Sequence, residues 1–143
     1  MKRAAILIGV DKTGDLPRLK DAALGAGLMR DWAVAQGIDR VTLLTDTQGA
    51  KVTLAGIKDA IKALVKAGNV GQLLVYFAGH GVSLQRQEYW LLSEAPDDAD
   101  EAVNVAGSVA LAATCGIGHV LLMSDCCRTA PEGVRAQSVR GGL

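Results

Sequence analysis

The sequence is poor in aromatic residues, proline and cysteine. Only 3% of its 143 residues are Phe, Trp or Tyr, whereas half are hydrophobic. A chain of this length can bury one core, which must here be filled by Leu, Val, Ile and Ala instead of aromatic rings. We therefore expect a single domain.

An excess of one charge and a long apolar run are also missing. Fifteen basic residues balance fifteen acidic ones, so nucleic acid is not an expected partner. No apolar run approaches the roughly 18 to 20 residues that cross a bilayer. Residues 4–10 follow a basic start but lack a small-residue cleavage site, so they do not resemble a signal peptide. We expect a soluble protein without a membrane partner.

The three cysteines, two of them adjacent at 126 and 127, form neither a disulfide framework nor a CxxC pair typical of zinc or redox sites. We therefore expect a cytoplasmic protein without a bound metal or other cofactor. The acidic run at 97–101 could supply oxygen ligands but lacks EF-hand spacing. A solvated loop is the better interpretation, and calcium is kept as an alternative cofactor.

What the sequence does contain is an alternation of strands and helices. Short apolar runs predict strands at 4–10, 40–45, 72–77 and 120–124, with a hairpin arm at 88–92. Helical patterns cover 19–36, 53–67 and 103–115; Leu24, Leu28 and Trp32 share one face of the first, and Thr53 is expected to cap the second. This order predicts an α/β fold with a mainly parallel sheet between helices.

Two segments follow predicted strands, where function gathers in such folds. One is Ala78-Gly79-His80-Gly81 and the other is Asp125-Cys126-Cys127-Arg128. A thiol is nucleophilic only as the thiolate, and a neighbouring imidazole promotes its ionisation and returns the proton to the leaving group. The glycines beside His80 are expected to let the backbone turn sharply. The amides of Gly81 and Cys127 could stabilise an oxyanion.

Each residue alone has a simpler structural explanation. His80 would be a turn histidine and Cys127 a small buried hydrophobe. Together they favour a catalytic pair, because the histidine precedes the cysteine by roughly 50 residues, the separation described for caspase-type sites. The chemistry of the residues does not by itself distinguish Cys127 from Cys126 as the nucleophile.

The run Tyr76 to Gly81 followed by Asp125 to Arg128 resembles the caspase and metacaspase superfamily, especially its bacterial caspase-like members, the orthocaspases. The resemblance spans nearly the whole chain and implies a caspase-like three-layer α/β/α fold. It further implies a cysteine endopeptidase that acts through an acyl-enzyme, with Cys127 attacking, His80 handling protons and the amides of Gly81 and Cys127 holding the oxyanion. Cys127 is selected because the family's nucleophile is the second residue after the aspartate.

The same resemblance implies a substrate preference. Caspases carry a glutamine at the position of Asp125 that helps to hold an aspartate side chain, whereas metacaspase-like members carry an acidic residue. A carboxylate there favours Arg or Lys before the scissile bond. Asp21 is a further candidate substrate-binding residue, one turn before Gly25, which takes the position of the family's second acidic pocket residue. Arg128 is expected to form a solvated or structural ion pair.

The caspase fold continues beyond its cysteine with a small subunit that adds two strands and much of the pocket, whereas this sequence ends at Leu143. Residues 1–129 are therefore expected to be a large-subunit domain lacking the small-subunit strands. Residues 130–143 would be a flexible tail or intersubunit linker, with Arg135 and Arg140 as candidate self-processing sites. Expected partners are a peptide or protein substrate and a small-subunit segment of the same parent protein.

Two other functions remain open. The first is a caspase-like interaction or regulatory module with little activity as an isolated fragment. The second is a flavodoxin-like domain that binds a small molecule at the loop after the first strand.

Overall fold

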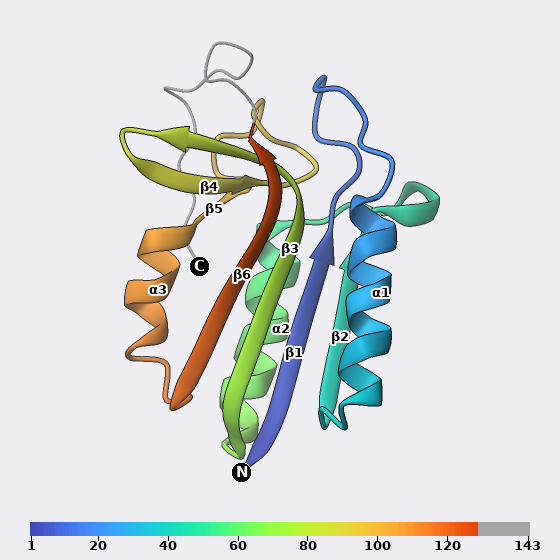
Figure 1. Ribbon diagram of the computed structural model, residues 1–143. Coiled ribbons are helices and arrows are strands. Elements are labelled where there is room, and N and C mark those ends of the chain that lie inside the picture. Colours follow the sequence, from blue (N-terminus) through green and yellow to red (C-terminus); the bar gives the residue numbers. More distant parts are fainter. Residues whose placement is uncertain (129–143) are drawn as a thin grey trace.

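The computed structural model describes residues 1–128, with side chains through Cys126. Within this range three α-helices pack on a six-stranded sheet. Helix α1 lies on one face of the sheet, and α2 and α3 lie on the other (Figure 1). The predicted α/β fold with three layers is therefore confirmed. The predictions for the tail at 130–143, including Arg135 and Arg140, fall outside the described residues.

The sheet is parallel at its centre and antiparallel at one end. Its strands are β1 (Lys2–Gly9), β2 (Arg40–Thr45), β3 (Val70–Leu84), β4 (Gln87–Leu91), β5 (Ala102–Asn104) and β6 (His119–Arg128). Strand β1 pairs in parallel with β2 and β3, and β3 pairs in parallel with β6. Beyond this region β3 continues into an antiparallel pairing with β4, which in turn pairs with β5.

The helices are α1 (Ala22–Ala35), α2 (Leu54–Ala67) and α3 (Val105–Ala112). The predicted cap of α2 is confirmed, because Thr53 Oγ1 accepts the N–H of Gly56 at 3.1 Å. At the other end Gly68 adopts a φ of 71°, which favours glycine and ends the helix. Helix α3 begins at Val105 because Asn104 accepts the N–H of Gly107 in the same way. No described helix is long and apolar enough to span a bilayer.

Helix α1 faces the sheet with its small residues. Leu24, Leu28 and Trp32 share a face as predicted, but they are 60%, 61% and 48% exposed. The side chains that α1 buries are those of Ala22, Ala23, Ala26 and Ala33. The reason is the close approach of α1 to β1, since a Cβ on Gly9 would lie 2.9 Å from the Cβ of Ala26. Larger side chains would not fit there, so the large apolar ones lie on the outer face.

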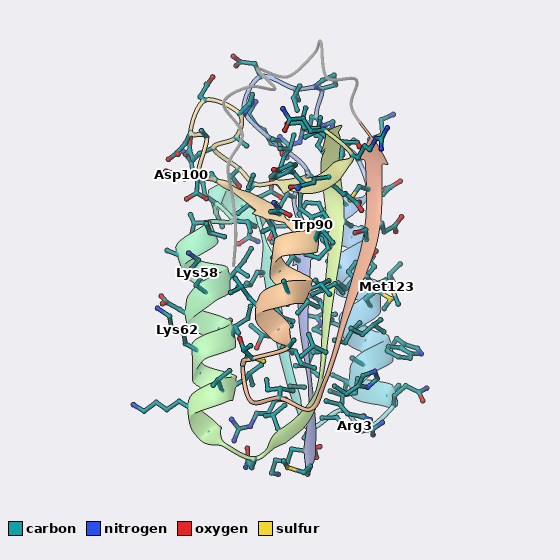
Figure 2. All side chains as sticks on the ribbon, turned by 90° about the vertical axis from the view of Figure 1, so that its left-hand side faces the viewer. Arg3, Lys58, Lys62, Trp90, Asp100 and Met123 are labelled. Carbon is teal, nitrogen blue, oxygen red and sulfur yellow. The ribbon has the colours of Figure 1, made fainter. Side chains whose placement is uncertain are left out.

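Buried aromatic residues hold the two strand regions together. Trp90 of β4 is fully buried and stacks on Phe77 of β3, with ring centroids 5.0 Å apart and planes 7° from parallel. Its Nε1 donates to Ser124 Oγ of β6 at 2.7 Å. In Figure 2 Trp90 lies above α3, where β4 meets the core. This arrangement ties the hairpin of β3 and β4 to β6.

Candidate active site

His80 lies in β3 and is buried, with 5% of its surface exposed. Its Nε2 lies 2.7 Å from the carbonyl oxygen of Pro17. Because a carbonyl oxygen only accepts hydrogen bonds, Nε2 carries a proton and donates it. In the neutral ring this leaves Nδ1 as the basic nitrogen. The contact therefore fixes both the orientation and the tautomer of the imidazole.

The loop that carries Pro17 is held by two carboxylates. Asp46 accepts the N–H groups of Asp11 at 3.1 Å and Lys12 at 2.8 Å. Asp11 Oδ1 in turn accepts the first two N–H groups of α1, at 2.9 and 3.1 Å. Asp11 thus provides a hydrogen-bond acceptor for the first N–H groups of the helix, since the N-cap residue Asp21 makes no side-chain capping bond. These bonds place the Pro17 carbonyl beside β3.

The two sequence motifs lie on neighbouring strands (Figure 1). The parallel register pairs Gly79 with Cys126 and His80 with Cys127. Segments far apart in the sequence are therefore adjacent at the backbone level. The side chains of Cys127 and Arg128 lie outside the described part of the chain, so their placement here is that of the backbone alone.

Cys126 faces the opposite layer from His80. Tyr76 and Ala78, which alternate with His80 along β3, belong to the core cluster beneath α1, whereas Cys126 packs on the cluster beneath α2 and α3. Its thiol points to Glu88 Oε1 at 3.8 Å. Burial, and then the Glu88 carboxylate, raise the pKa of Cys126 to about 12. A neutral thiol on the far face argues against Cys126 as the nucleophile.

The glycines beside His80 do not form a turn, contrary to the prediction. Strand β3 runs through both, and neither has a positive φ. Close packing leaves no room for a side chain at either position. A Cβ on Gly81 would lie 2.9 Å from Cys126 Cβ, and one on Gly79 would lie 2.7 Å from Phe77 Cζ. The backbone of Gly81 lies between β4 and β6, paired with Trp90 and Arg128.

Asp125 is exposed on β6, and its carboxylate accepts a hydrogen bond of 2.9 Å from the hydroxyl of Tyr76. Tyr76 is 5% exposed, and burial together with the Asp125 carboxylate raises its pKa to about 12. A Cβ on Gly25 would lie 3.6 Å from the same hydroxyl. Gly25 therefore borders this pair from α1.

Asp21 is not drawn into this group. It is exposed before the start of α1, and no hydrogen bond or ion pair among the described residues links its carboxylate to Tyr76 or Asp125. Two contributors were missed from the sequence. Tyr76 shares a strand face with His80, so the period of two could have identified it. Pro17 acts through its backbone carbonyl, which has no sequence signal.

Metal-binding geometry is absent from the part of the chain that the structure describes, where no three His, Cys, Asp or Glu side chains converge. In the acidic run, Asp98 Oδ1 instead accepts the N–H of Asp100 at 3.0 Å, a local turn. Calcium remains an untested prediction.

Comparison with known proteins places this geometry in a family. The family model of the caspase domain matches residues 2–141. The crystal structure of protein GSU0716 from Geobacter sulfurreducens matches with a TM-score of 0.65 and 23% identity, over 91% of this chain and 52% of that one. This likeness shows a shared fold, and the chain spans about half the length of that neighbour. A search of the curated proteins finds no significant match. The family match spans both motifs, and the chain therefore belongs to the caspase domain family of cysteine peptidases.

Proposed function

We propose that this chain carries the catalytic pair of a cysteine endopeptidase, with Cys127 as the nucleophile and His80 as the general base. The observation that carries the proposal is the register of β3 and β6, which pairs these two residues. Two further findings support it: the His80 ring is fixed by Pro17, and Cys126 is a neutral thiol in the other layer. Family membership favours peptide hydrolysis over the flavodoxin-like alternative.

In the proposed reaction Nδ1 of His80 takes the proton of the Cys127 thiol, and the thiolate attacks the carbonyl carbon of the substrate. The tetrahedral intermediate collapses when the imidazolium protonates the leaving amine, which leaves a thioester. Water then attacks the thioester as His80 removes its proton, and the acid and the free thiol are released. The Pro17 carbonyl would stabilise the imidazolium through Nε2, and the amides of Gly81 and Cys127 would hold the oxyanion.

We propose that cleavage follows Arg or Lys. Asp125 presents a carboxylate two residues before Cys127, and Tyr76 orients it through a hydrogen bond. A guanidinium can pair with such a carboxylate in a bidentate manner. Asp21 is retained as a second candidate, since it is the N-cap residue of α1 and lies one turn before Gly25. Side chains with a negative charge would be repelled at this position.

Exposed apolar side chains of α1 and β6 support the proposal of a partner segment. We call this surface the α1–β6 face; it consists of Leu24, Leu28 and Trp32 of α1 and of Leu121 and Met123 of β6. The register pairs Leu121 with Leu74 and Met123 with Tyr76 of the layer beneath α1. Figure 2 shows Met123 on the side of the sheet where α1 lies. We propose that a small-subunit segment of the parent protein covers this face.

The outer edge of β6 favours a second candidate function. Within residues 1–128, β6 pairs only with β3, so its outer edge can accept a further strand. The fragment could therefore serve as an interaction or regulatory module with little activity of its own.

Hydrolysis of a peptide library tests the endopeptidase proposal. The parent protein and this chain are each assayed with Arg, Lys, citrulline or Asp before the scissile bond. We expect Arg and Lys peptides to be cleaved and neutral citrulline to be cleaved far more slowly. Cleavage by the parent that persists in Cys127→Ala would contradict the assigned nucleophile, and faster cleavage after Asp would contradict the assigned pocket.

A further inference from the structure

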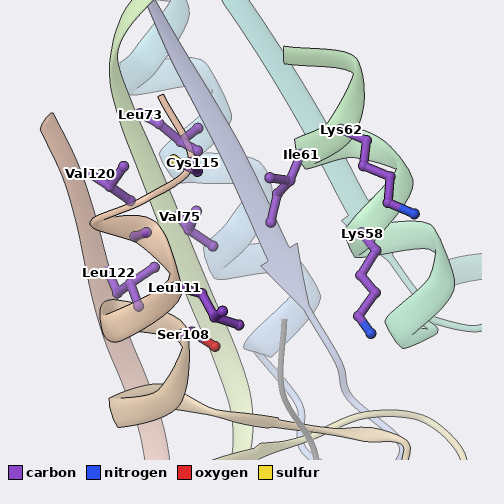
Figure 3. A pocket seen from close by; sticks show the side chains of 11 residues that line it. Lys58, Ile61, Lys62, Leu73, Val75, Ser108, Leu111, Cys115, Val120 and Leu122 are labelled. Atoms are coloured by element: carbon purple, nitrogen blue, oxygen red, sulfur yellow. The ribbon is translucent and has the colours of Figure 1, made fainter. Parts of the chain in front are cut away.

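A cavity of about 320 Å³ lies between α2 and α3, on the face of the sheet opposite α1. Figure 3 shows residues of α2 on one side and of α3 on the other, with Val75 of β3 between them and Val120 and Leu122 of β6 on the α3 side. The lining residues are Lys58, Ile61, Lys62, Leu73, Val75, Ser108, Leu111, Ala112, Cys115, Val120 and Leu122. Its volume falls at the small end of the range for small-molecule sites.

The floor of the cavity is apolar. Leu73 and Val75 of β3 are nearly fully buried, and Val120 and Leu122 of β6 pack beside them. The hydroxyl of Ser108 is already used, since it donates to the carbonyl of Asn104 at 2.7 Å. A ligand that fills this floor must therefore present hydrocarbon to it.

The α2 wall supplies the only charges among the lining residues, and both are positive. Lys58 and Lys62 lie one helical turn apart, and no lining residue is acidic. Neither lysine takes part in the ion pairs found among residues 1–128. Like charges at this spacing destabilise a helix, and an anion bound between the two ammonium groups would relieve that repulsion.

We propose that this cavity binds a small anionic amphiphile. Its hydrocarbon part would lie on the floor formed by β3 and β6, and its carboxylate, sulfonate or phosphate head would lie at Lys58 and Lys62. The proposal is independent of the peptidase function, because none of the lining residues belongs to the candidate active site. Two strands link it covalently to that site: β3 carries Val75 and His80, and β6 carries Leu122 and Cys127.

Titration of the ¹⁵N-labelled chain with decanoate, followed by NMR, tests the proposal. We expect saturable shifts at α2, α3 and the facing part of β6. Decanol, which has the same chain and no charge, should bind more weakly. Vesicles with and without phosphatidylglycerol distinguish the source of the head group: binding of free decanoate alone indicates a soluble ligand, and binding of the anionic vesicles as well indicates a lipid.

Variants distinguish the specific contribution of Lys58 and Lys62 to binding from an effect of the overall charge of the protein. In Lys58→Glu/Lys62→Glu the dissociation constant of decanoate should rise about tenfold, as expected for two partly exposed ion pairs. Lys66→Glu, on the same helix but outside the cavity, should change it less than about twofold. Because charge reversal could disturb α2, Lys58→Gln/Lys62→Gln is measured in parallel and should also weaken binding. Absence of saturable binding, equal binding by both double variants and the wild type, or shifts confined to the α1–β6 face would each overturn the proposal.

Discussion

The hydroxyl of Tyr76 donates a hydrogen bond of 2.9 Å to the carboxylate of Asp125. One partner is buried beneath α1, whereas the other is exposed beside the paired backbones of His80 and Cys127. A hydrogen bond from a buried donor to an exposed carboxylate restricts the rotation of the carboxylate without neutralising its charge. In the proposed peptidase Tyr76 is therefore a positioning residue for the substrate pocket.

Tyr76→Phe tests that role. Removal of the hydroxyl leaves the charge of Asp125 but frees its orientation, so kcat/KM for Arg peptides should fall about three- to tenfold, with water replacing part of the lost hydrogen bond. The loss in kcat/KM should be larger for Arg peptides than for Lys peptides, because the bidentate pairing of a guanidinium depends more strongly on the orientation of the carboxylate. Tyr89→Phe, on the partly buried hydroxyl of β4, is the matched control. An equal loss for Arg and Lys, or an equal effect of the control, would show that Tyr76 is merely structural.

Alkaline pH should destabilise the chain through Cys126. The pKa of this thiol is raised from its usual value near 9 to about 12 in the folded protein. Above pH 9 the unfolded thiol therefore loses its proton while the folded one keeps it, and stability falls as pH rises towards 12. Tyr76 adds to the decline above pH 10, since its pKa is also raised.

Urea denaturation midpoints between pH 7 and 11 measure this effect. Cys126→Ser lacks the titrating thiol, so its midpoint should fall less steeply than that of the wild type between pH 9 and 10. Parallel curves for the two proteins would show that the Cys126 environment is not as described.

Much of this fold could be predicted from the sequence, because apolar runs and helix boundaries are local signals. The strand at 40–45 and the Thr53 cap were located correctly. Two features depend on distant contacts and were not predicted. Strand β3 extends to Leu84 because β6 pairs with it as far as Gly81 and β4 pairs with it from Gly81 to Leu84. Helix α1 turns its alanines inward because of its closeness to Gly9. Periodicity identifies which residues share a face but not which face is buried.

The same limit applies to the candidate site. The sequence motifs contain His80, Cys127 and Asp125, and their order along the chain suggested that they meet. The carbonyl of Pro17 could not be found in this way, since every residue carries one and only the loop between β1 and α1 positions it. The layer that Cys126 faces likewise follows from strand register and not from spacing.

Gly81→Ala should destabilise the chain by about 1–3 kcal/mol, because the new methyl group would overpack the space beside Cys126 Cβ. A control in which a methyl group meets open space is Gly27→Ala in α1. That change should stabilise the chain by about 0.5–1 kcal/mol, since alanine favours the helix. Chemical denaturation measures both. If Gly81→Ala were neutral, the close packing of β3 against β6 would be wrong.

The α1–β6 face should be tolerant of charge in the isolated chain and intolerant of it in the complex. Leu121→Lys and Met123→Lys alter exposed side chains, so the unfolding free energy of this chain should change by about 0.5 kcal/mol or less. Co-purification with the remainder of the parent protein should be lost. Val109→Lys, an exposed position on α3, serves as the control. Retained co-purification of the β6 variants would contradict the proposed partner surface.

The central claim is that Cys127, activated by His80, is the nucleophile. Its most direct test is covalent labelling of the protein with a thiol-reactive peptidyl-arginine probe, with the modified residue located by mass spectrometry. We predict one equivalent of label at Cys127, none at the neutral thiol of Cys126, and loss of labelling in His80→Ala. Labelling at Cys126, or labelling of Cys127 at an unchanged rate without His80, would contradict the account.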